Sequence, residues 1–320
     1  MLSFRDIVKD DFDAVNCLII DQLHSEVGLV EQIGHYLIEA GGKRLRPLLV
    51  LLAARASGYE GQRHIDLAVI IEFIHTATLL HDDVVDTSEL RRGRFTANAQ
   101  WGNAPSVLVG DFLYSRAFQM MVALDNIEIM RVLADTTNII SEGEVQQLVN
   151  IGDPELSESD YLAVIGHKTA QLFKGAGQTV ALLSNADTTT AVALADFGWH
   201  LGIAFQLVDD ALDYDSNNAD LGKNAGDDLA EGKMTLPLIQ AMKCGSSTQR
   251  KHLRTVIQER DVSQLPLVMD IINDTASLQY TLTVAREHIA QAKRSIAGLP
   301  PSQYQSAMLE LADFAVDRTY

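Results

Sequence analysis

The sequence has little cysteine, little proline and no long uninterrupted apolar run. Its two cysteines, Cys17 and Cys244, lie far apart, so a disulfide framework is not expected and a reducing cytosol is indicated. No apolar run reaches the ~18 residues of a membrane span, and the charged N-terminus lacks the apolar core of a signal peptide. With only 7 prolines in 320 residues, long periodic stretches continue without a break. These features predict a soluble, cytoplasmic, all-helical protein.

Positive charge is also scarce. The chain has 25 Lys and Arg against 43 Asp and Glu, a net charge of −18. This balance argues against nucleic acid as a partner and against binding to anionic membranes by charge alone. The apolar fraction of 47% fits a globular protein with a sizeable core. Since neither sustained β alternation nor a low-complexity linker occurs, we expect one all-α domain over residues 1–320.

Helical periodicity extends over most of the chain. It predicts helices over residues 3–24, 26–40, 63–90, 107–124, 126–149, 158–184 and 188–215, an apolar helix with Pro47 in its first turn, and several helices between 235 and 320. The residues from 91 to 106 are expected to form a loop. Gly175 and Gly177, inside a predicted helix, indicate close packing or close approach of a ligand, because glycine weakens a helix interior.

An acidic motif interrupts one of these apolar helices. Asp82, Asp83 and Asp86 follow a run of apolar residues, and burying uncompensated carboxylates costs several kcal/mol. Asp82 and Asp86 share one helix face because they are four residues apart. His75 lies two turns earlier on that face. A lone histidine on an apolar face is usually a core residue, but this alignment favours a ligand contact.

The same pattern returns at Asp209, Asp210 and Asp213, with Gln206 one turn earlier. One such motif is more often a solvated helix face, but two copies that each end an apolar helix indicate a common site. If the helices pack side by side, six carboxylates face one cavity, and like charges at close range require divalent cations. Hard oxygen ligands select Mg²⁺, which is usually completed by substrate phosphates. The pattern therefore predicts a magnesium-bound diphosphate.

Cations are concentrated where such a ligand would need them. Lys43, Arg44 and Arg46 stand at the start of an apolar helix, where positive charge is unfavourable unless an anion binds. The wider set exceeds what one diphosphate needs, and it consists of Lys43, Arg46, Arg91, Arg92, Lys168, Lys223 and Lys233. Two diphosphates are therefore plausible.

Five segments together resemble a known family. They are GGKRLRP, HDDVVDTSELRRG, GHKTAQLF, FQLVDDALDY and GDDLAEGKMTLPL, between residues 40 and 240. In this order they are similar to the signature regions of the trans-isoprenyl diphosphate synthases, particularly bacterial long-chain members that make octaprenyl diphosphate for ubiquinone or menaquinone side chains. The resemblance implies a single-domain helical bundle of the isoprenoid synthase type around a central deep cavity. It also implies a homodimer, with residues 107–124 as a candidate interface, and a product delivered to the membrane.

The resemblance further implies roles for residues that match the family motifs. Two or three Mg²⁺ ions per site would be held by Asp82, Asp86 and Asp209. The catalytic set would be Asp82, Asp83, Asp86, Arg91, Lys168, Asp209, Asp210 and Asp213. The allylic diphosphate, expected to be farnesyl diphosphate, would be bound by Arg91, Lys168, Thr169, Gln206 and Lys223, and isopentenyl diphosphate by Lys43, Arg46, His75 and Arg92. Lys233 would also bind substrate.

Product length is expected to depend on small residues one turn before Asp82. Ala77 and Thr78 would let the growing chain pass, whereas a bulky aromatic near this place gives short products in the family. Phe118, Met120 or Met121 on the next helix could then form the floor of the pocket. The alternative is that Ala77 only packs between helices and that the methionines fill the core.

Three other functions remain open on sequence alone. A short-chain synthase would make farnesyl or geranylgeranyl diphosphate with the same motifs. A terpene cyclase also uses an aspartate-rich helix, but it would not need the GGKRLRP segment for a second diphosphate. A non-catalytic partner subunit would be expected to lose acids from one motif, whereas both motifs are complete here.

Overall fold

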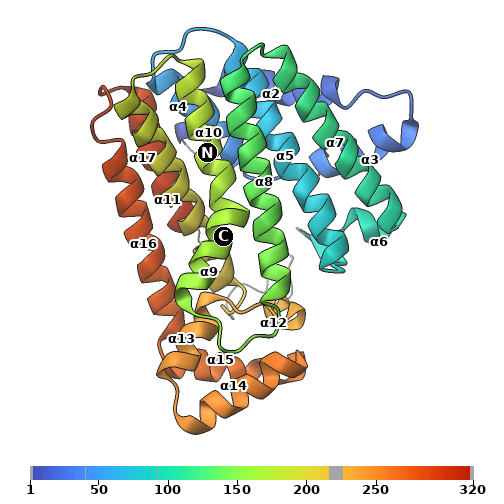
Figure 1. Cartoon of the computed structure of the whole chain (residues 1–320), viewed down its shortest axis with the longest axis vertical. Coiled ribbons are helices and arrows are strands. Elements are labelled where there is room, and N and C mark those ends of the chain that lie inside the picture. The colour runs from blue at the N-terminus through green and yellow to red at the C-terminus, as the bar shows by residue number, and fades with distance from the viewer. Residues whose placement is uncertain (1–2, 40, 92, 216–225, 318–320) are drawn as a thin grey trace.

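The computed structural model describes residues 3–39, 41–91, 93–215 and 226–317, and helices dominate these ranges (Figure 1). The elements up to the middle of the chain are α1 (Ser3–Asp6), α2 (Lys9–Gln22), α3 (Gly28–Glu39), α4 (Leu45–Ala56), α5 (Arg63–Val85), β1 (Leu90–Arg91), β2 (Arg94–Phe95), α6 (Ala97–Trp101), α7 (Asn103–Ala123) and α8 (Ile127–Val149). Those that follow are α9 (Glu158–Ile165), η1 (Gly166–Ala170), α10 (Gln171–Leu183), α11 (Thr188–Leu212), α12 (Asp227–Glu231), α13 (Leu236–Cys244), α14 (Ser247–Glu259), η3 (Val262–Gln264), α15 (Leu265–Asp274), α16 (Ser277–Ser295) and α17 (Gln303–Val316). The expected all-α class is confirmed.

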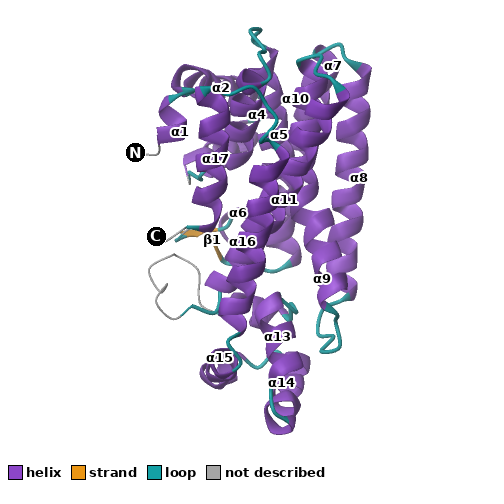
Figure 2. Cartoon of the chain, turned by 90° about the vertical axis from the view of Figure 1, so that its left-hand side faces the viewer, coloured by secondary structure: helices purple, strands orange, loops and turns teal. Residues whose placement is uncertain are grey.

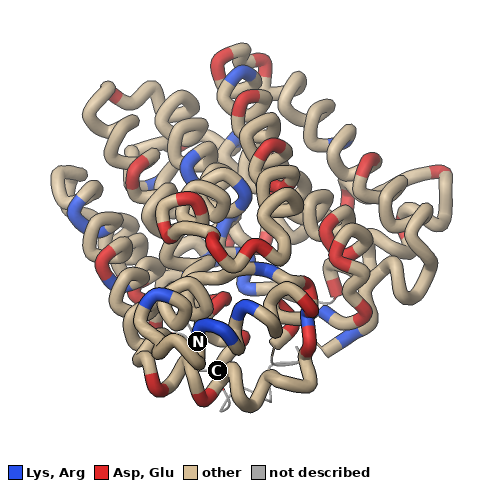
Figure 3. Tube along the Cα trace, turned by 60° about the horizontal axis from the view of Figure 1, so that its bottom comes forward, with Lys and Arg blue, Asp and Glu red and all other residues tan. Residues whose placement is uncertain are grey.

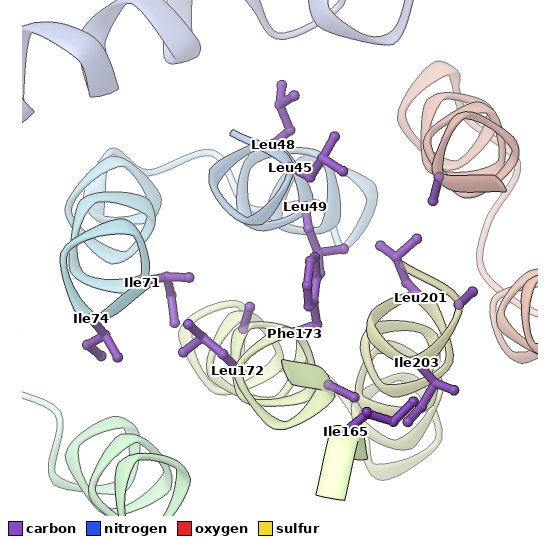
Figure 4. Close-up of a cluster of buried hydrophobic side chains, with 14 of the residues drawn as sticks. Leu45, Leu48, Leu49, Ile71, Ile74, Ile165, Leu172, Phe173, Leu201 and Ile203 are labelled. Carbon is purple, nitrogen blue, oxygen red and sulfur yellow. The ribbon is translucent and has the colours of Figure 1, made fainter. Parts of the chain in front are cut away.

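The long helices lie side by side, and two of them carry the acid motifs (Figure 2). α4, α5, α10 and α11 form the centre, where Leu49 of α4 points at Phe173 of α10 (Figure 4). Glycines allow α10 and α11 to approach closely, since a Cβ added at Gly177 would lie 2.2 Å from the carbonyl oxygen of Leu194. A Cβ at Gly175 would lie 2.7 Å from Thr136 of α8. Of the two explanations for these glycines, helix packing is therefore the one that applies.

The expected loop at 91–106 is wrong in most of its length. Leu90 pairs with Phe95 in a short antiparallel hairpin, and α6 follows at once, capped by the Thr96 hydroxyl, which accepts from the backbone N–H of Ala99 at 3.4 Å. Gly102, with φ of 91°, breaks the helix and allows α7 to begin at Asn103. The hairpin matters for the site because it carries Arg91 back toward the first acid motif.

Several other helix boundaries differ from expectation, and the predicted helix 63–90 already ends at Val85. The predicted helix 3–24 is interrupted between Asp6 and Lys9. The predicted helix 158–184 contains a π-helical segment, Gly166–Ala170, between α9 and α10. A Cβ at Gly166 would lie 2.6 Å from Trp199 of α11, so the chain passes close to that helix here. Such π segments recur at functional sites, and this one carries Lys168 and Thr169.

Two of the long helices, α5 and α11, are strongly apolar. By length and composition alone, α5 and α11 could cross a membrane, with mean hydropathy of 1.2 and 1.4 in their most apolar windows. One or two such helices are weak evidence for a membrane span. In both windows 56% of the residues are buried inside the protein, and the core helix of a soluble protein meets the same criterion.

Candidate functional site

A deep cavity of about 1180 Å³ lies between α4, α5, α8, the α9–η1 segment, α11 and α12. Figure 3 brings the α12 end forward and shows acidic and basic stretches interspersed near its centre. The predicted site residues that line the cavity are Lys43, Arg46, His75, Thr78, Asp82, Asp86, Arg91, Lys168, Thr169, Gln206, Asp209, Asp210, Asp213 and Lys233. Arg92 and Lys223 lie outside the described residues. The structure thus brings segments from both halves of the chain to one place.

Asp83 does not face this cavity. Its side chain is 2% exposed, and the Nε and Nη2 atoms of Arg91 donate to its Oδ1 at 2.8 and 2.7 Å. Burial raises the pKa of Asp83, although Arg91 opposes that shift. Because adjacent helical residues point about 100° apart, Asp83 turns toward the hairpin while Asp82 turns toward the cavity. The expectation that six carboxylates face one cavity is therefore wrong for this residue.

Asp82 and Asp86 each meet a lysine in the cavity wall. Lys168 Nζ lies 3.5 Å from Asp82 Oδ2, and Lys233 Nζ lies 2.8 Å from Asp86 Oδ2. Both lysines have a raised pKa, because the carboxylates around them outweigh the effect of burial. One lysine beside each of these aspartates therefore offsets part of its negative charge, and the role of divalent cations here stays a prediction.

The second acid motif divides in a similar way. Asp210 is 4% exposed and accepts hydrogen bonds from the Tyr161 hydroxyl and, at 2.7 Å, from Gln206 Nε2. Thr169 in turn donates to Gln206 Oε1 at 2.8 Å. Burial, and then Asp228, raise the pKa of Asp210. Asp210 therefore orders Gln206 and Thr169 beside the cavity, while Asp209 lies at its wall.

α12 is fastened to the end of the second motif. Asp213 Oδ2 accepts a hydrogen bond from the backbone N–H of Asp228 at 3.2 Å. The backbone N–H of Gly226 donates to the carbonyl oxygen of Asp213 at 3.1 Å. These contacts hold the segment that carries Lys233 against the C-terminal end of α11, so that its ammonium group reaches Asp86 on the opposite wall.

The basic start of α4 meets His75 directly. Arg46 Nη1 lies 3.1 Å from His75 Nε2, and its guanidinium stacks 4.3 Å above the Phe173 ring. Lys43 lies 5.7 Å from the ring centre of Phe314. Arg44, which the sequence grouped with them, donates to Asn16 Oδ1 at 2.6 Å. Lys43 and Arg46, with the His75 ring beside Arg46, thus form one positive wall of the cavity, separate from the lysines at the acid motifs.

The predicted metal ligands fit a hard cation completed by a substrate. Asp82, Asp86 and Asp209 offer only carboxylate oxygens to the cavity, and such ligands suit Mg²⁺. Within the described ranges, no group of three or more His, Cys, Asp or Glu side chains is arranged to hold a metal ion on its own.

Ala77 and Thr78, the two chain-length residues predicted on α5, lie on different faces of that helix. Thr78 lines the cavity, and its hydroxyl donates to the carbonyl oxygen of His75 at 2.8 Å. Ala77 is fully buried and falls on the opposite side of the helix from the lining stripe. On α7, Met120 and Met121 are buried and Phe118 packs against Tyr114 at 5.4 Å between ring centres. The packing alternative for Ala77 thus gains support, and its role in product length stays a prediction.

Sequence reasoning missed three residues at the site. Tyr161 holds Asp210, Glu144 lies 2.5 Å from Lys168, and Glu231 contacts Lys233. Glu144 occurs within a polar run that resembles a solvated helix end, and Glu231 lies inside the GDDLAEGKMTLPL segment, where only the lysine attracted an assignment. A signal was present at Gly143, because a glycine in the middle of a helix indicates close approach by another segment.

Helices that bring two aspartate motifs and two groups of cations around one deep cavity define the isoprenoid synthase class. The family model described as polyprenyl synthetase matches residues 27–274, and the chain belongs to that family. It is 50% identical to the octaprenyl diphosphate synthase of Haemophilus influenzae, over 100% of this chain and 98% of the relative, and 47% identical to that of Escherichia coli, over 99% and 98%. A polyprenyl synthase from Caulobacter crescentus, solved with calcium and isoprenyl diphosphate, has a TM-score of 0.96 and 43% identity, covering 99% of this chain and 97% of that one.

Proposed function

We propose that the protein is a Mg²⁺-dependent trans-polyprenyl diphosphate synthase. It joins isopentenyl diphosphate head to tail onto an allylic diphosphate, farnesyl diphosphate as the starting primer, and repeats this step to make all-trans octaprenyl diphosphate for quinone side chains. The observation that carries the proposal is that one cavity holds both the acid motifs and a separate positive wall. The two octaprenyl diphosphate synthases that match over nearly the whole chain support the long product.

The allylic diphosphate is assigned to the side of the cavity that carries the acid motifs. Asp82, Asp86 and Asp209 would hold two or three Mg²⁺ ions, a role supported by the calcium and isoprenyl diphosphate in the Caulobacter protein. When bound, the metal supplies Lewis-acid stabilisation of the leaving diphosphate. Lys168 and Lys233 add charge beside it, and Thr169 and Gln206 add hydrogen-bonding groups that Asp210 keeps in place.

Isopentenyl diphosphate is assigned to the positive wall formed by Lys43, Arg46 and His75, with Arg92 as a further prediction outside the described residues. Stacking on Phe173 holds the Arg46 guanidinium in a fixed plane, which suits recognition of a phosphate. Leu45, Ile165 and Phe205 are among the apolar residues that line the cavity. By excluding water they would protect the allylic cation until the double bond of isopentenyl diphosphate attacks it.

The wider proposal concerns assembly and location. We assign residues 1–320 to one synthase domain that acts in the cytoplasm as a homodimer and delivers its product to the membrane. The dimer assignment is supported by apolar residues that α7 and the start of α8 expose, namely Leu108 at 66%, Val122 at 61% and Ile127 at 66%. Light scattering at micromolar concentration should give twice the monomer mass, and a monomer would contradict the assignment.

A product assay with radiolabelled isopentenyl diphosphate, resolved by chain length, tests the function. Octaprenyl diphosphate is the expected main product from farnesyl diphosphate. Accumulation of farnesyl or geranylgeranyl diphosphate would instead identify a short-chain synthase. A folded protein that forms no prenyl product alone would favour the non-catalytic subunit, and cyclic hydrocarbons would favour a terpene cyclase.

A further inference from the structure

Each lysine that contacts the first acid motif also contacts a glutamate, which for Lys168 comes from α8 and for Lys233 is the last residue of the preceding helix, α12. Lys168 Nζ lies 2.5 Å from Glu144 Oε2 and 3.5 Å from Asp82 Oδ2. On the other side, Lys233 Nζ lies 2.8 Å from Asp86 Oδ2 and also contacts Glu231 Oε2. The same trio of aspartate, lysine and glutamate is therefore built twice, with α8 supplying one glutamate and α12 the other.

The backbone fixes these trios in place. A Cβ at Gly143 would lie 2.8 Å from the backbone nitrogen of Lys168, so α8 approaches the π segment closely and carries Glu144 to the lysine. Near α12, the backbone N–H of Lys233 donates to the carbonyl oxygen of Asp228 at 2.8 Å. The carbonyl oxygen of Gly232 accepts from Gly152 at 2.8 Å. Both lysines therefore start from anchored positions at the cavity wall.

Each trio places one ammonium group between two carboxyl groups when no substrate is bound. Lys168 Nζ has a carboxyl group on either side, Asp82 at 3.5 Å and Glu144 at 2.5 Å. One positive charge is then shared by two carboxylates. A divalent cation that binds Asp82 must compete with Lys168 for this carboxylate, and breaking a buried pair is costly when one partner is left alone. Glu144 offers the lysine a second carboxylate at closer range.

On the basis of the proposed function, we infer that Glu144 and Glu231 are positioning residues for the metal–diphosphate complex. They keep Lys168 and Lys233 paired when Asp82 and Asp86 turn to the metal, and they hold both ammonium groups beside the arriving diphosphate. When the two aspartates leave the lysines for the metal, each lysine then keeps its glutamate partner, and no buried charge is left unpaired. Neither glutamate needs to touch metal or substrate for this role.

The test measures binding rather than turnover. Calorimetric titration with manganese pyrophosphate should show about tenfold weaker binding to Glu144→Gln than to the wild-type protein, in line with measured couplings within charged networks. Glu142→Gln is the matched control, because Glu142 is exposed on the same helix and only accepts a hydrogen bond from Asn138. It should bind like wild type. Thermal unfolding of each ligand-free variant checks the fold, and Glu144→Asp, which keeps the charge, should bind with intermediate affinity.

A double-mutant cycle separates positioning from a simple loss of negative charge. If Glu144 acts through the lysine, Glu144→Gln should have no further effect in a Lys168→Met background. Additive losses, or wild-type binding by Glu144→Gln, would overturn the inference while leaving the proposed function intact. Failure of the wild-type protein itself to bind manganese pyrophosphate would overturn both. The same cycle with Glu231→Gln and Lys233→Met tests the second trio.

Discussion

Arg91 holds Asp83 through two of its guanidinium nitrogens, at 2.7 and 2.8 Å from the same carboxylate oxygen. The contact joins the C-terminal part of α5 to the hairpin that follows it. The backbone carbonyl oxygen of Asp83 also accepts from Asn98 Nδ2 at 3.0 Å, which ties in α6. Asp83 thus organises the chain behind the cavity wall, whereas its neighbour Asp82 belongs to the wall itself.

The first prediction follows from the different positions of Asp83 and Asp82. Asp83→Ala should lower the free energy of unfolding by about 3 kcal/mol, because it leaves a charged guanidinium without its buried partner. Asp82→Ala, one residue away, should change stability much less, since Lys168 retains Glu144. Urea unfolding monitored by circular dichroism makes the comparison. Equal losses in the two variants would contradict the structural role of Asp83.

The second prediction concerns the metal. Asp82→Ala and Asp209→Ala should each reduce prenyl transfer about a hundredfold or more, because each removes a carboxylate expected to hold the cation at the leaving diphosphate. Chelation of divalent ions should abolish turnover of the wild-type protein, and added Mg²⁺ should restore it. Steady-state assays with labelled isopentenyl diphosphate report both effects. Turnover that survives chelation, or full activity in either variant, would rule out the assignment of these ligands.

Periodicity in the sequence predicted the long helices well, and α5, α8 and α11 lie close to the expected ranges. The four-residue spacing placed Asp82 and Asp86 on one face, but it could not show that Asp83 pairs with Arg91 behind the cavity, because that contact depends on the hairpin. The π segment around Lys168 was also invisible, since its residues are compatible with an ordinary α-helix. Which cation meets which acid depends on distances between helices, so the roles of Glu144 and Glu231 appeared only with the packing.

The third prediction concerns pH and a histidine pair that joins α11 to α16. His200 Nδ1 lies 2.9 Å from His288 Nδ1. Burial, and then His200, lower the pKa of His288 from 6.5 to about 4, and burial lowers that of His200 as well. At mildly acidic pH these two histidines therefore bind protons in the unfolded chain but not in the folded protein. The pair's contribution to stability is complete above pH 6.5 and is lost as the pH falls from there toward 4.

Comparison with a variant isolates this contribution. Glu144 and Asp210 have raised pKa values and act in the opposite direction over acidic pH, so the wild-type profile alone is not diagnostic. His288→Gln should be less stable near neutrality but should lose less stability on acidification. The difference between the two profiles should change by less than about 1.4 kcal/mol per pH unit for this partly exposed ring. Urea midpoints from pH 7.5 to 4.5 provide the measurement, and parallel profiles would contradict the prediction.

The last prediction concerns product length. The growing chain must extend away from the diphosphate along α5, and Thr78 stands on the cavity face one turn, about 5.4 Å, before Asp82. Thr78→Phe should place a ring in that path and shift the products from octaprenyl toward farnesyl and geranylgeranyl diphosphate, with the first condensation retained. Gln147 of α8 also lines the cavity, and the control Gln147→Leu, which replaces it by a side chain of similar volume, should preserve the long product. Chain-resolved chromatography of labelled products measures the shift.

The Ala77→Tyr variant tests which side of α5 the growing prenyl chain follows. Ala77 is fully buried, so a tyrosine must displace its neighbours and should lower stability by about 1–3 kcal/mol. Shortened products in a folded Ala77→Tyr protein would route the chain between α5 and α7, where Met120 and Met121 could then form the floor. An octaprenyl product with reduced stability would assign Ala77 to packing and leave Thr78 as the determinant. If both Thr78→Phe and Ala77→Tyr still made octaprenyl diphosphate, product length would be set elsewhere in the cavity and both assignments would fall.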